Sequence, residues 1–317
     1  MDLVPTIDIG NPSATDLQEL DRAASDHGFF LLAGHGLDEM IDRTWEIARQ
    51  FFACDETVKG PIRRSAEHTL GYHDRELTKR RRDNKEVFDY IDPLVGDSRE
   101  LNQWPTAPTG FHEQLIEFFD EFATLADRTV TVLAQALGQP ATSDDELTIS
   151  RSSSSVRLNH YPIEDPVPVE ERESLAPLGE TALGHHTDTG VLTLLLQDNT
   201  GGLQAHSPAH GWIDVPPRPG TIVVNLADAM QVWTNDRYKA AVHRVVPMTS
   251  SNRYSIPFFA NPPRNARIAP IADLAEPTPR YREFAWRELI EGRVADNYED
   301  AGAEDIQISD FAITAAT

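Results

Sequence analysis

Short apolar runs, separated by glycine, proline and asparagine, fill much of the chain from Val156 onward. Runs of this length bounded by turn-forming residues are typical of β-strands. A succession of such strands predicts an antiparallel barrel or a double-sheet jelly roll. Before Val156 the pattern differs, because apolar residues recur there at helical spacing. The sequence therefore predicts an α+β fold in which helices pack around a jelly-roll core.

Three stretches before residue 140 are predicted to be helices. Thr15 followed by Gln18 resembles a capping box, which predicts a first helix that ends near Gly28. A second amphipathic helix is predicted from the helical spacing of Ile41, Trp45, Ala48 and Phe52. A third runs from about residue 111 to residue 133 and is stopped by Gly138 and Pro140.

A candidate metal site begins with His186 and Asp188, which stand two residues apart just before the apolar run 191–196. On an extended chain, side chains at i and i+2 leave the same face, with α-carbons about 6.6 Å apart at ~3.3 Å per residue. Both side chains can then bind one ion while Thr187 points away. His243, in a second apolar run, supplies a third ligand. Two imidazoles and one carboxylate leave half of an octahedron open, as in non-haem Fe(II) oxygenases.

A candidate carboxylate site follows ten residues after His243. Arg253 and Ser255 again stand at i and i+2, so on a strand both side chains would face one target. The guanidinium is a rigid fork of donors that matches the two oxygens of a carboxylate. Next to the iron ligands, this pair describes a pocket for a 2-oxo acid that chelates iron through its keto-acid end.

Charge and cysteine content narrow the possible partners and location. The chain of 317 residues has a net charge of −23, so a nucleic acid would be repelled over most of the surface. Cys54 is the only cysteine, so no internal disulfide can form. Neither an apolar stretch long enough to span a membrane nor a secretory signal is visible. We expect a cytoplasmic protein that acts on a small molecule and contacts neither nucleic acid nor membrane.

Several motifs occur in a fixed order along the chain. They are Asn-His-Tyr-Pro at 159–162, His-Thr-Asp at 186–188, Thr-Leu-Leu-Leu-Gln-Asp at 193–198, Gly-Leu-Gln at 202–204, Val-Asn-Leu-Ala-Asp at 224–228 and His-Arg-Val at 243–245. In this order they resemble the iron- and 2-oxoglutarate-dependent dioxygenases of the isopenicillin N synthase type, which include plant flavonoid and gibberellin oxidases. The resemblance extends from about Val4 to Pro263.

The resemblance implies a double-stranded β-helix (jelly-roll, cupin-like) core flanked by helices. Residues 1–150 would form a mainly helical region with short strands, residues 151–265 the catalytic core and residues 266–317 a helical extension, all packed as one compact unit. His186, Asp188 and His243 would bind Fe(II). Arg253 and Ser255, joined by Tyr161 and Asn159, would hold 2-oxoglutarate.

Candidate substrate residues are fewer and come from three segments. Arg157 shares a strand face with Asn159 and Tyr161, so it could bind an anionic or polar group of the substrate. Strand parity and the resemblance also add Phe259 and Asn261, and the resemblance places Phe88 and Tyr90 at the pocket entrance. The basic run Lys79, Arg80, Arg81, Arg82 and Lys85 is either a solvated loop or an anion-recruiting rim.

The expected reaction oxidises a C–H bond of a small organic molecule, of the kind found in secondary metabolism, with O2 and 2-oxoglutarate as co-substrates and succinate and CO2 as products. Hydroxylation is the commonest outcome in such enzymes, and desaturation and cyclization stay open. Two alternatives remain: an oxidase that uses Fe(II) and O2 without 2-oxoglutarate, and a non-catalytic jelly-roll binding or sensor protein. Residues 163–184 are either a lid or a surface insertion. The sequence leaves the oligomeric state undetermined.

Overall fold

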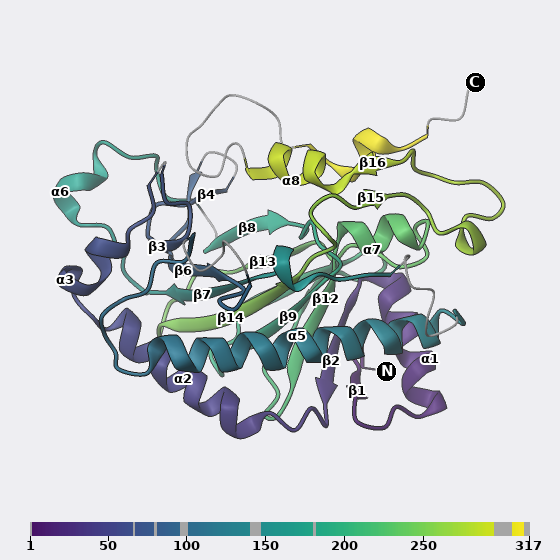
Figure 1. The fold of residues 1–317 in the computed structure, drawn as a ribbon, viewed down its shortest axis with the longest axis horizontal. Coiled ribbons are helices and arrows are strands. Elements are labelled where there is room, and N and C mark those ends of the chain that lie inside the picture. The colour runs from purple at the N-terminus through teal and green to yellow at the C-terminus, as the bar shows by residue number, and fades with distance from the viewer. Residues whose placement is uncertain are drawn as a thin grey trace.

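Two β-sheets form the centre of the structure (Figure 1), a computed structural model that describes residues 2–65, 67–78, 81–95, 101–139, 147–179, 182–294 and 306–313. Within these residues the larger sheet has eight strands, in the order β1 (Thr6–Asp8), β2 (Phe29–Ala33), β12 (Ile222–Leu226), β9 (Leu192–Gln197), β14 (Arg253–Ala260), β7 (Ser155–Tyr161), β6 (Glu86–Ile91) and β3 (Gly71–His73). The smaller sheet has the order β11 (Gly211–Asp214), β10 (Leu203–Ser207), β13 (His243–Val245) and β8 (Leu183–His186).

The path of the chain between the two sheets is that of a jelly roll. From β7 to β14 the chain alternates between the larger and the smaller sheet, except that β10 and β11 form a hairpin within the smaller one. All the pairings among these eight strands are antiparallel. The predicted jelly-roll core is confirmed.

The N-terminal segment completes the larger sheet at both edges. β1 and β2 extend it beyond β12, and β6 and β3 extend it beyond β7. The β1–β2 pair is parallel, because the helix between these strands carries the chain back to the same end of the sheet. Residues 1–150 and 151–265 therefore share one sheet.

Helices cover one side of the larger sheet, the side that faces away from β8 and β13 (Figure 1). They are α1 (Ala14–Asp26), α2 (Asp38–Phe52) and α5 (Phe111–Ala136), and short helices α3 (Glu56–Lys59), α6 (Val169–Arg172) and α7 (Asp228–Trp233) lie elsewhere. All three predicted helices are confirmed. The predicted capping box was wrong by two residues, because Ser13 caps α1 in a reciprocal pair with Asp16. No helix within the described residues is long and apolar enough to cross a membrane.

Strand parity gives the larger sheet two chemically different sides. On β14, Ile256 and Phe258 point towards the helices, and the ring of Phe258 lies 5.2 Å from that of Phe119 on α5. Residues of the opposite parity, including Arg253 and Ser255, face the smaller sheet. The helices therefore close the apolar side and leave the other side for the functional site.

The C-terminal extension packs onto the jelly roll near the loop that follows β8. It contains the hairpin of β15 (Arg267–Ile268) and β16 (Phe284–Ala285), helix α8 (Trp286–Val294) and a final 3₁₀ turn, Ile308–Phe311. Phe284 stacks on Phe311 with ring centroids 3.9 Å apart. The indole of Trp286 donates a hydrogen bond to the Thr189 carbonyl, 3.0 Å away.

The described part of segment 163–184 is tied to the N-terminal strands. Arg82, on β5 (Arg81–Arg82), which pairs with β4 (Leu77–Thr78), forms two 2.6 Å hydrogen bonds with the Asp165 carboxylate. Its backbone also bonds to Pro177 and Gly179. The lid hypothesis stays a prediction.

The packing of Phe258 against α5 predicts a large loss of stability in Phe258→Ala. This side chain is fully buried, and removal of a buried phenylalanine leaves a cavity that costs about 3–5 kcal/mol. Denaturant unfolding followed by tryptophan fluorescence measures the change. Val169→Ala is the control, because Val169 is 69% exposed and should change the unfolding free energy by less than about 0.5 kcal/mol. Equal unfolding midpoints for the two variants would contradict this view of the core.

Candidate active site

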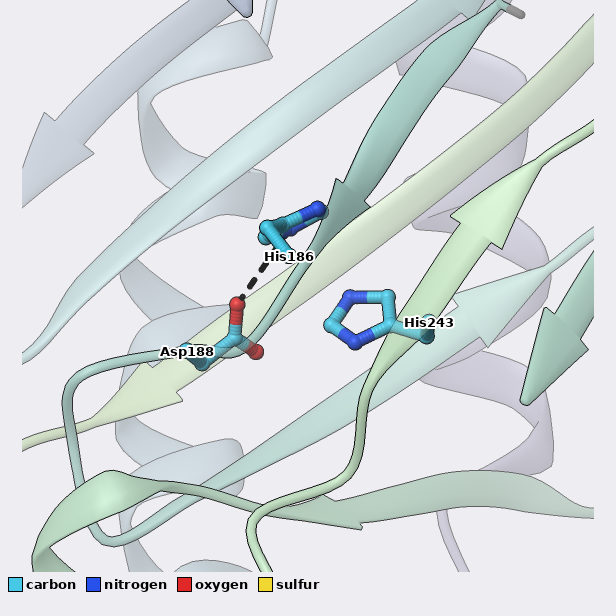
Figure 2. Close-up of side chains that lie close together, drawn as sticks. All are labelled: His186, Asp188 and His243. Atoms are coloured by element: carbon cyan, nitrogen blue, oxygen red, sulfur yellow. Dashed lines mark ion pairs between the residues drawn. The ribbon is translucent and has the colours of Figure 1, made fainter. Parts of the chain in front are cut away.

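His186, Asp188 and His243 converge between the two sheets (Figure 2). His186 is the last residue of β8, Asp188 lies in the loop just after it, and His243 opens β13 directly opposite His186 in the strand pairing. One potential ligand atom from each residue lies within 4.8 Å of the other two. Among the described residues, no other group of three such side chains is this close together.

Backbone carbonyls orient both imidazoles towards a common point. Nδ1 of His186 donates to the Gly184 carbonyl at 2.8 Å, and Nδ1 of His243 donates to the Ala241 carbonyl at 2.9 Å. Because a carbonyl can only accept, Nδ1 carries the hydrogen in each ring, and Nε2 keeps its lone pair for a metal. Both histidines are thus held in the tautomer that a ligand requires.

The Asp188 carboxylate is fixed through one oxygen and leaves the other for the metal. Its Oδ2 accepts hydrogen bonds from the Thr193 hydroxyl and from the Asn225 amide, the latter at 2.8 Å. Its Oδ1 lies 3.6 Å from Nε2 of His186. Thr193 and Asn225 were not predicted as functional, although both lie in the motifs quoted above and face each other on β9 and β12.

Electrostatics favour the ligand protonation states. Burial, and then the nearby His243, lower the pKa of His186 to about 3. Burial by itself would raise the pKa of Asp188, but the two histidines and the hydrogen bonds from Thr193 and Asn225 bring it below its ordinary value. At neutral pH the site therefore offers a neutral imidazole at His186 and an ionised carboxylate, the forms that bind a divalent metal. Two nitrogens and one oxygen on one side of a cavity fit an iron ion with open positions.

A second anchor, Arg253, lies in the same cavity. It is 1% exposed, its Nε donates to the Gly201 carbonyl at 2.8 Å, and its guanidinium lies 4.9 Å from the Tyr161 ring centroid. Its Nη1 is buried and has no hydrogen-bond partner among the described residues. A buried charged donor without a partner is costly, so this position suits an anionic ligand. The carboxylate of 2-oxoglutarate fits this requirement.

Strand register places the remaining predicted 2-oxoglutarate residues beside Arg253. Arg253 is paired with Tyr161 and Ser255 with Asn159 across β14 and β7. The Asn159 amide donates to the Ser255 hydroxyl at 3.3 Å. These four residues line the same cavity as the three metal ligands, and its volume is about 90 Å³. The structure therefore brings together all seven residues that the sequence assigned to metal and co-substrate.

Of the predicted substrate residues, Arg157 and Phe259 line this cavity. The prediction that Phe88 and Tyr90 line its entrance was wrong. Both are fully buried on the helix side of β6, where Phe88 packs on Phe111 and the Tyr90 hydroxyl donates to the Leu115 carbonyl. On β6 the alternate side chains, such as Asp89, face the other way, so strand parity explains the error.

The prediction that Asn261 contacts the substrate was also wrong. Asn261 lies one residue beyond the end of β14, where the strand parity that suggested its direction no longer applies. Its amide donates to the Ser153 carbonyl at 2.8 Å, and its backbone N–H donates to the Ser154 hydroxyl. It fixes the chain entering β7 and is not among the residues that line the cavity.

Lys85 lines the cavity and was not predicted as a site residue. It is 3% exposed, and its Nζ lies 2.7 Å from Glu76 and 3.1 Å from Asp83. In the sequence, Lys85 belongs to one basic run, but the structure places the described members of this run in different surroundings. Arg82 pairs with Asp165, Arg81 is exposed, and Lys79 and Arg80 lie outside the described residues. No local pattern distinguished the lysine that faces the cavity.

The C-terminal extension braces the loop that carries Asp188. Nη2 of Arg293 on α8 lies 2.9 Å from the Asp228 carboxylate and 3.3 Å from the Thr187 hydroxyl. The backbone N–H of Asp228 donates to the Asp188 carbonyl at 2.9 Å. The Trp286 bond to Thr189 holds the same loop from the other side. Residues on both sides of Asp188 are thus fixed by a segment about 100 residues away in sequence.

This brace predicts that Arg293→Gln weakens metal binding. Loss of the ion pair frees the Thr187 loop and leaves the buried Asp228 without its cation, so the ligands are less well ordered before metal arrives. We expect the dissociation constant for Mn(II), measured by electron paramagnetic resonance, to rise about tenfold, and less in Arg293→Lys. Arg287→Gln is the control, because Arg287 is exposed on the same helix. Unchanged Mn(II) affinity in Arg293→Gln would refute the role of the brace.

A half-buried histidine on β3, His73, predicts acid sensitivity. Burial, followed by the charge of Arg64, lowers the pKa of His73 to about 4. In the unfolded chain, His73 takes up a proton below about pH 6.5. In the folded chain it takes up this proton only near pH 4. The free energy of unfolding therefore falls as the pH decreases from about 6.5 to about 4. In metal-free protein, His73→Gln should lose less unfolding free energy than wild type between pH 7 and pH 4.5. His210→Gln is the control, because His210 is exposed, and its unfolding free energy should change with pH as that of wild type does. If the unfolding free energy of His73→Gln also changes with pH as that of wild type does, His73 is not the origin of the pH dependence.

Two protein-family models match the sequence, one in the N-terminal part and one in the jelly-roll core. The model of the 2OG-Fe(II) oxygenase superfamily matches residues 152–262, and the model described as non-haem dioxygenase in morphine synthesis N-terminal matches residues 4–107. The 2-oxoglutarate-Fe(II) type oxidoreductase hxnY of Emericella nidulans is 32% identical over 319 residues, which cover 93% of this chain and 88% of that protein. Gibberellin 2-beta-dioxygenase 2 of Arabidopsis thaliana is 29% identical over 294 residues, which cover 89% and 82%.

Solved structures agree with these sequence relatives. A full-length Neurospora crassa protein, solved in complex with alpha-KG, superposes with a TM-score of 0.77 at 27% identity, over 92% of this chain and 96% of the solved chain. JOX2, in complex with 2OG, Fe and JA, has the same TM-score and identity over 90% of this chain and 83% of JOX2. The metal triad and the Arg253 anchor of this structure lie within the region that the superfamily model matches. The chain therefore belongs to the 2OG-Fe(II) oxygenase superfamily and is an iron- and 2-oxoglutarate-dependent dioxygenase.

Proposed function

We propose that this dioxygenase oxidises a C–H bond of a small organic molecule, most simply by hydroxylation, and converts 2-oxoglutarate to succinate and CO2. The observation that carries the proposal is one cavity that holds both a complete metal triad and a buried arginine with an open N–H. Relatives support the substrate class, because the Neurospora crassa protein has been solved with thymine and JOX2 with JA. A role in secondary metabolism, a cytoplasmic location and the exclusion of nucleic acid as a partner stay predictions from the sequence and its relatives.

Each residue of the cavity would have a distinct task. His186, Asp188 and His243 would hold iron, which supplies the oxidising chemistry with O2 when bound. Arg253 would bind the distal carboxylate of 2-oxoglutarate through its open Nη1, and Ser255 would add a hydroxyl donor.

The walls around these groups orient the ligands and keep water out. Tyr161 and Asn159 would complete the 2-oxoglutarate pocket beside Arg253 and Ser255. Leu195, Leu203 and Val245 form an apolar lining that excludes water from the reacting groups. Arg157 and Phe259 remain as proposed substrate contacts.

The two alternative functions are disfavoured by particular observations. An oxidase without 2-oxoglutarate would need another anion at the buried Nη1 of Arg253. A non-catalytic sensor would not need three metal ligands whose tautomers and carboxylate oxygen are each fixed by a second residue. Neither alternative forms succinate from 2-oxoglutarate, whereas the proposed function does.

Turnover of 2-oxoglutarate tests the proposed function. With Fe(II), O2 and 2-oxoglutarate, wild-type protein should form succinate, and His243→Ala should form none, because a ligand of the metal is lost. Succinate is measured by mass spectrometry. Oxidised product without any oxo acid would favour the oxidase, whereas absence of Fe(II) binding to wild type, measured by calorimetry under argon, would favour the sensor.

Substitution of Arg253 tests the co-substrate anchor separately. Arg253→Gln removes a charged donor, and a hydrogen bond to a charged group contributes about 1.5–3 kcal/mol. We expect the KM for 2-oxoglutarate to rise about 10- to 100-fold. Arg264→Gln is the control, since Arg264 is exposed on the loop after β14. An unchanged KM for 2-oxoglutarate in Arg253→Gln would exclude this anchor.

A further inference from the structure

We propose that the substrate is a compact organic acid whose carboxylate binds to Lys85 and Arg157. This inference rests on the proposed function, because it names the class of molecule that the same cavity oxidises. Both cations line the cavity that holds the metal triad. Neither takes part in the Arg253 anchor, so they form a second cationic region, here called the cationic wall.

The position of the cationic wall separates it from the co-substrate pocket. On β7, Arg157 lies four residues before Tyr161, which is about 13 Å at ~3.3 Å per residue. Across the sheet the order is β9, β14 and β7. Arg157 therefore lies two strands, about 10 Å at ~4.8 Å per strand, from β9, whose Thr193 binds the metal ligand Asp188. A carboxylate at the wall would therefore leave a short molecule reaching towards the metal ligands.

Lys85 and Arg157 line the cavity, whereas the carboxylates that hold them do not. Glu76 lies 2.7 Å from both Lys85 and Arg157, and the Asp89 carboxylate binds Arg157 with two hydrogen bonds of 2.7 and 2.9 Å. Glu76, Asp83 and Asp89 are buried and do not line the cavity. The lining therefore contains the cationic residues and not the carboxylates that balance them, so an anion in the cavity would lie closer to the positive charge.

Fixed ion pairs make this arrangement suitable for recognition. Because buried carboxylates hold the ammonium and the guanidinium in place, little side-chain freedom is lost when a ligand binds. A carboxylate accepts from both cations, whereas an amine would be repelled and an amide would offer only one neutral acceptor. The wall therefore selects for an anion by charge and by hydrogen-bond polarity.

The rest of the free cavity surface is apolar and limits the body of the acid. Leu183, Leu203, Val245 and Phe259 are among the residues that line it. Phe259 is only partly buried, so its ring is available to pack on a flat hydrocarbon or aromatic group. A small acid with a cyclic or aromatic body satisfies both the cationic wall and this apolar surface.

Matched acids and amides test the proposal. Benzoate, phenylacetate and cyclohexanecarboxylate, and the three corresponding primary amides, are each added to wild-type enzyme with Fe(II) and 2-oxoglutarate. The readouts are stimulated release of CO2 from 2-oxoglutarate and the change in the visible absorption of the anaerobic Fe(II)–2-oxoglutarate complex. We expect at least one acid to give both signals at concentrations at least tenfold lower than its amide. Equal or stronger responses to the amides, or no response to any acid, would overturn the proposal.

Two variants connect the preference to the cationic wall. Arg157→Gln leaves Asp89 paired with Arg64 and Glu76 paired with Lys85. Lys85→Met combined with Asp83→Asn removes a cation and an anion together, so the double variant leaves the buried charges balanced. In both variants, the half-saturating concentration of the acid divided by that of its amide should rise at least tenfold. Lys85→Arg should keep most of the wild-type preference for the acid. Because the readout is a ratio within one protein, lower activity from altered folding does not imitate it. A ratio equal to that of wild type in both variants would overturn the proposal.

The exposed Arg81→Gln is the matched control, because it removes a cation of the same basic run without entering the cavity. It should leave the ratio and the 2-oxoglutarate KM unchanged. Failure of the proposed function is distinguishable, because wild-type protein would then produce no succinate under any condition. Succinate formation without a preference for acids would refute only the cationic wall.

Discussion

The antiparallel pairing of β8 with β13 is the constraint on which the site depends. It sets His243 opposite His186 although 56 other residues separate them in the sequence. The carbonyls of Gly184 and Ala241, two residues before each histidine, then orient the rings from the same relative position. One pairing of strands therefore supplies two ligands, their tautomers and their common direction. Asp188 needs only the following turn to join them.

Alternation along the strands of the larger sheet assigns the remaining functions. On β7 and β14 one parity faces α5 and builds the apolar core, and the other faces the cavity with Arg253, Ser255, Tyr161 and Asn159. The same rule produced one correct set of predictions and one error. It placed Arg157 and Phe259 correctly because these residues lie within regular strands. Asn261 was misplaced because the strand had already ended.

Buried charge differs in character between the two ends of the cavity. At the co-substrate end, Arg253 has a carbonyl partner, an aromatic ring beneath it and an open Nη1. At the other end, Lys85 and Arg157 are held by carboxylates that do not reach the cavity. Arg253 thus lacks an acceptor for one buried donor, whereas Lys85 and Arg157 already have carboxylate partners and are proposed to attract an anion through their positive charge at the cavity.

The sequence by itself determined the metal ligands, the Arg253 and Ser255 pair and the jelly-roll class. Each of these is visible as a spacing of two residues or as short motifs in a fixed order, and local strand geometry then sets the direction in which the side chains point. Only the tertiary structure decided the role of Lys85, the inward packing of Phe88 and Tyr90, and the brace from Arg293 to the Asp188 loop. Those features depend on which face of a strand another segment covers, and on contacts between residues up to about 100 positions apart. Such packing has no local signature, because the same lysine in the same basic run would look identical in the sequence if it faced solvent.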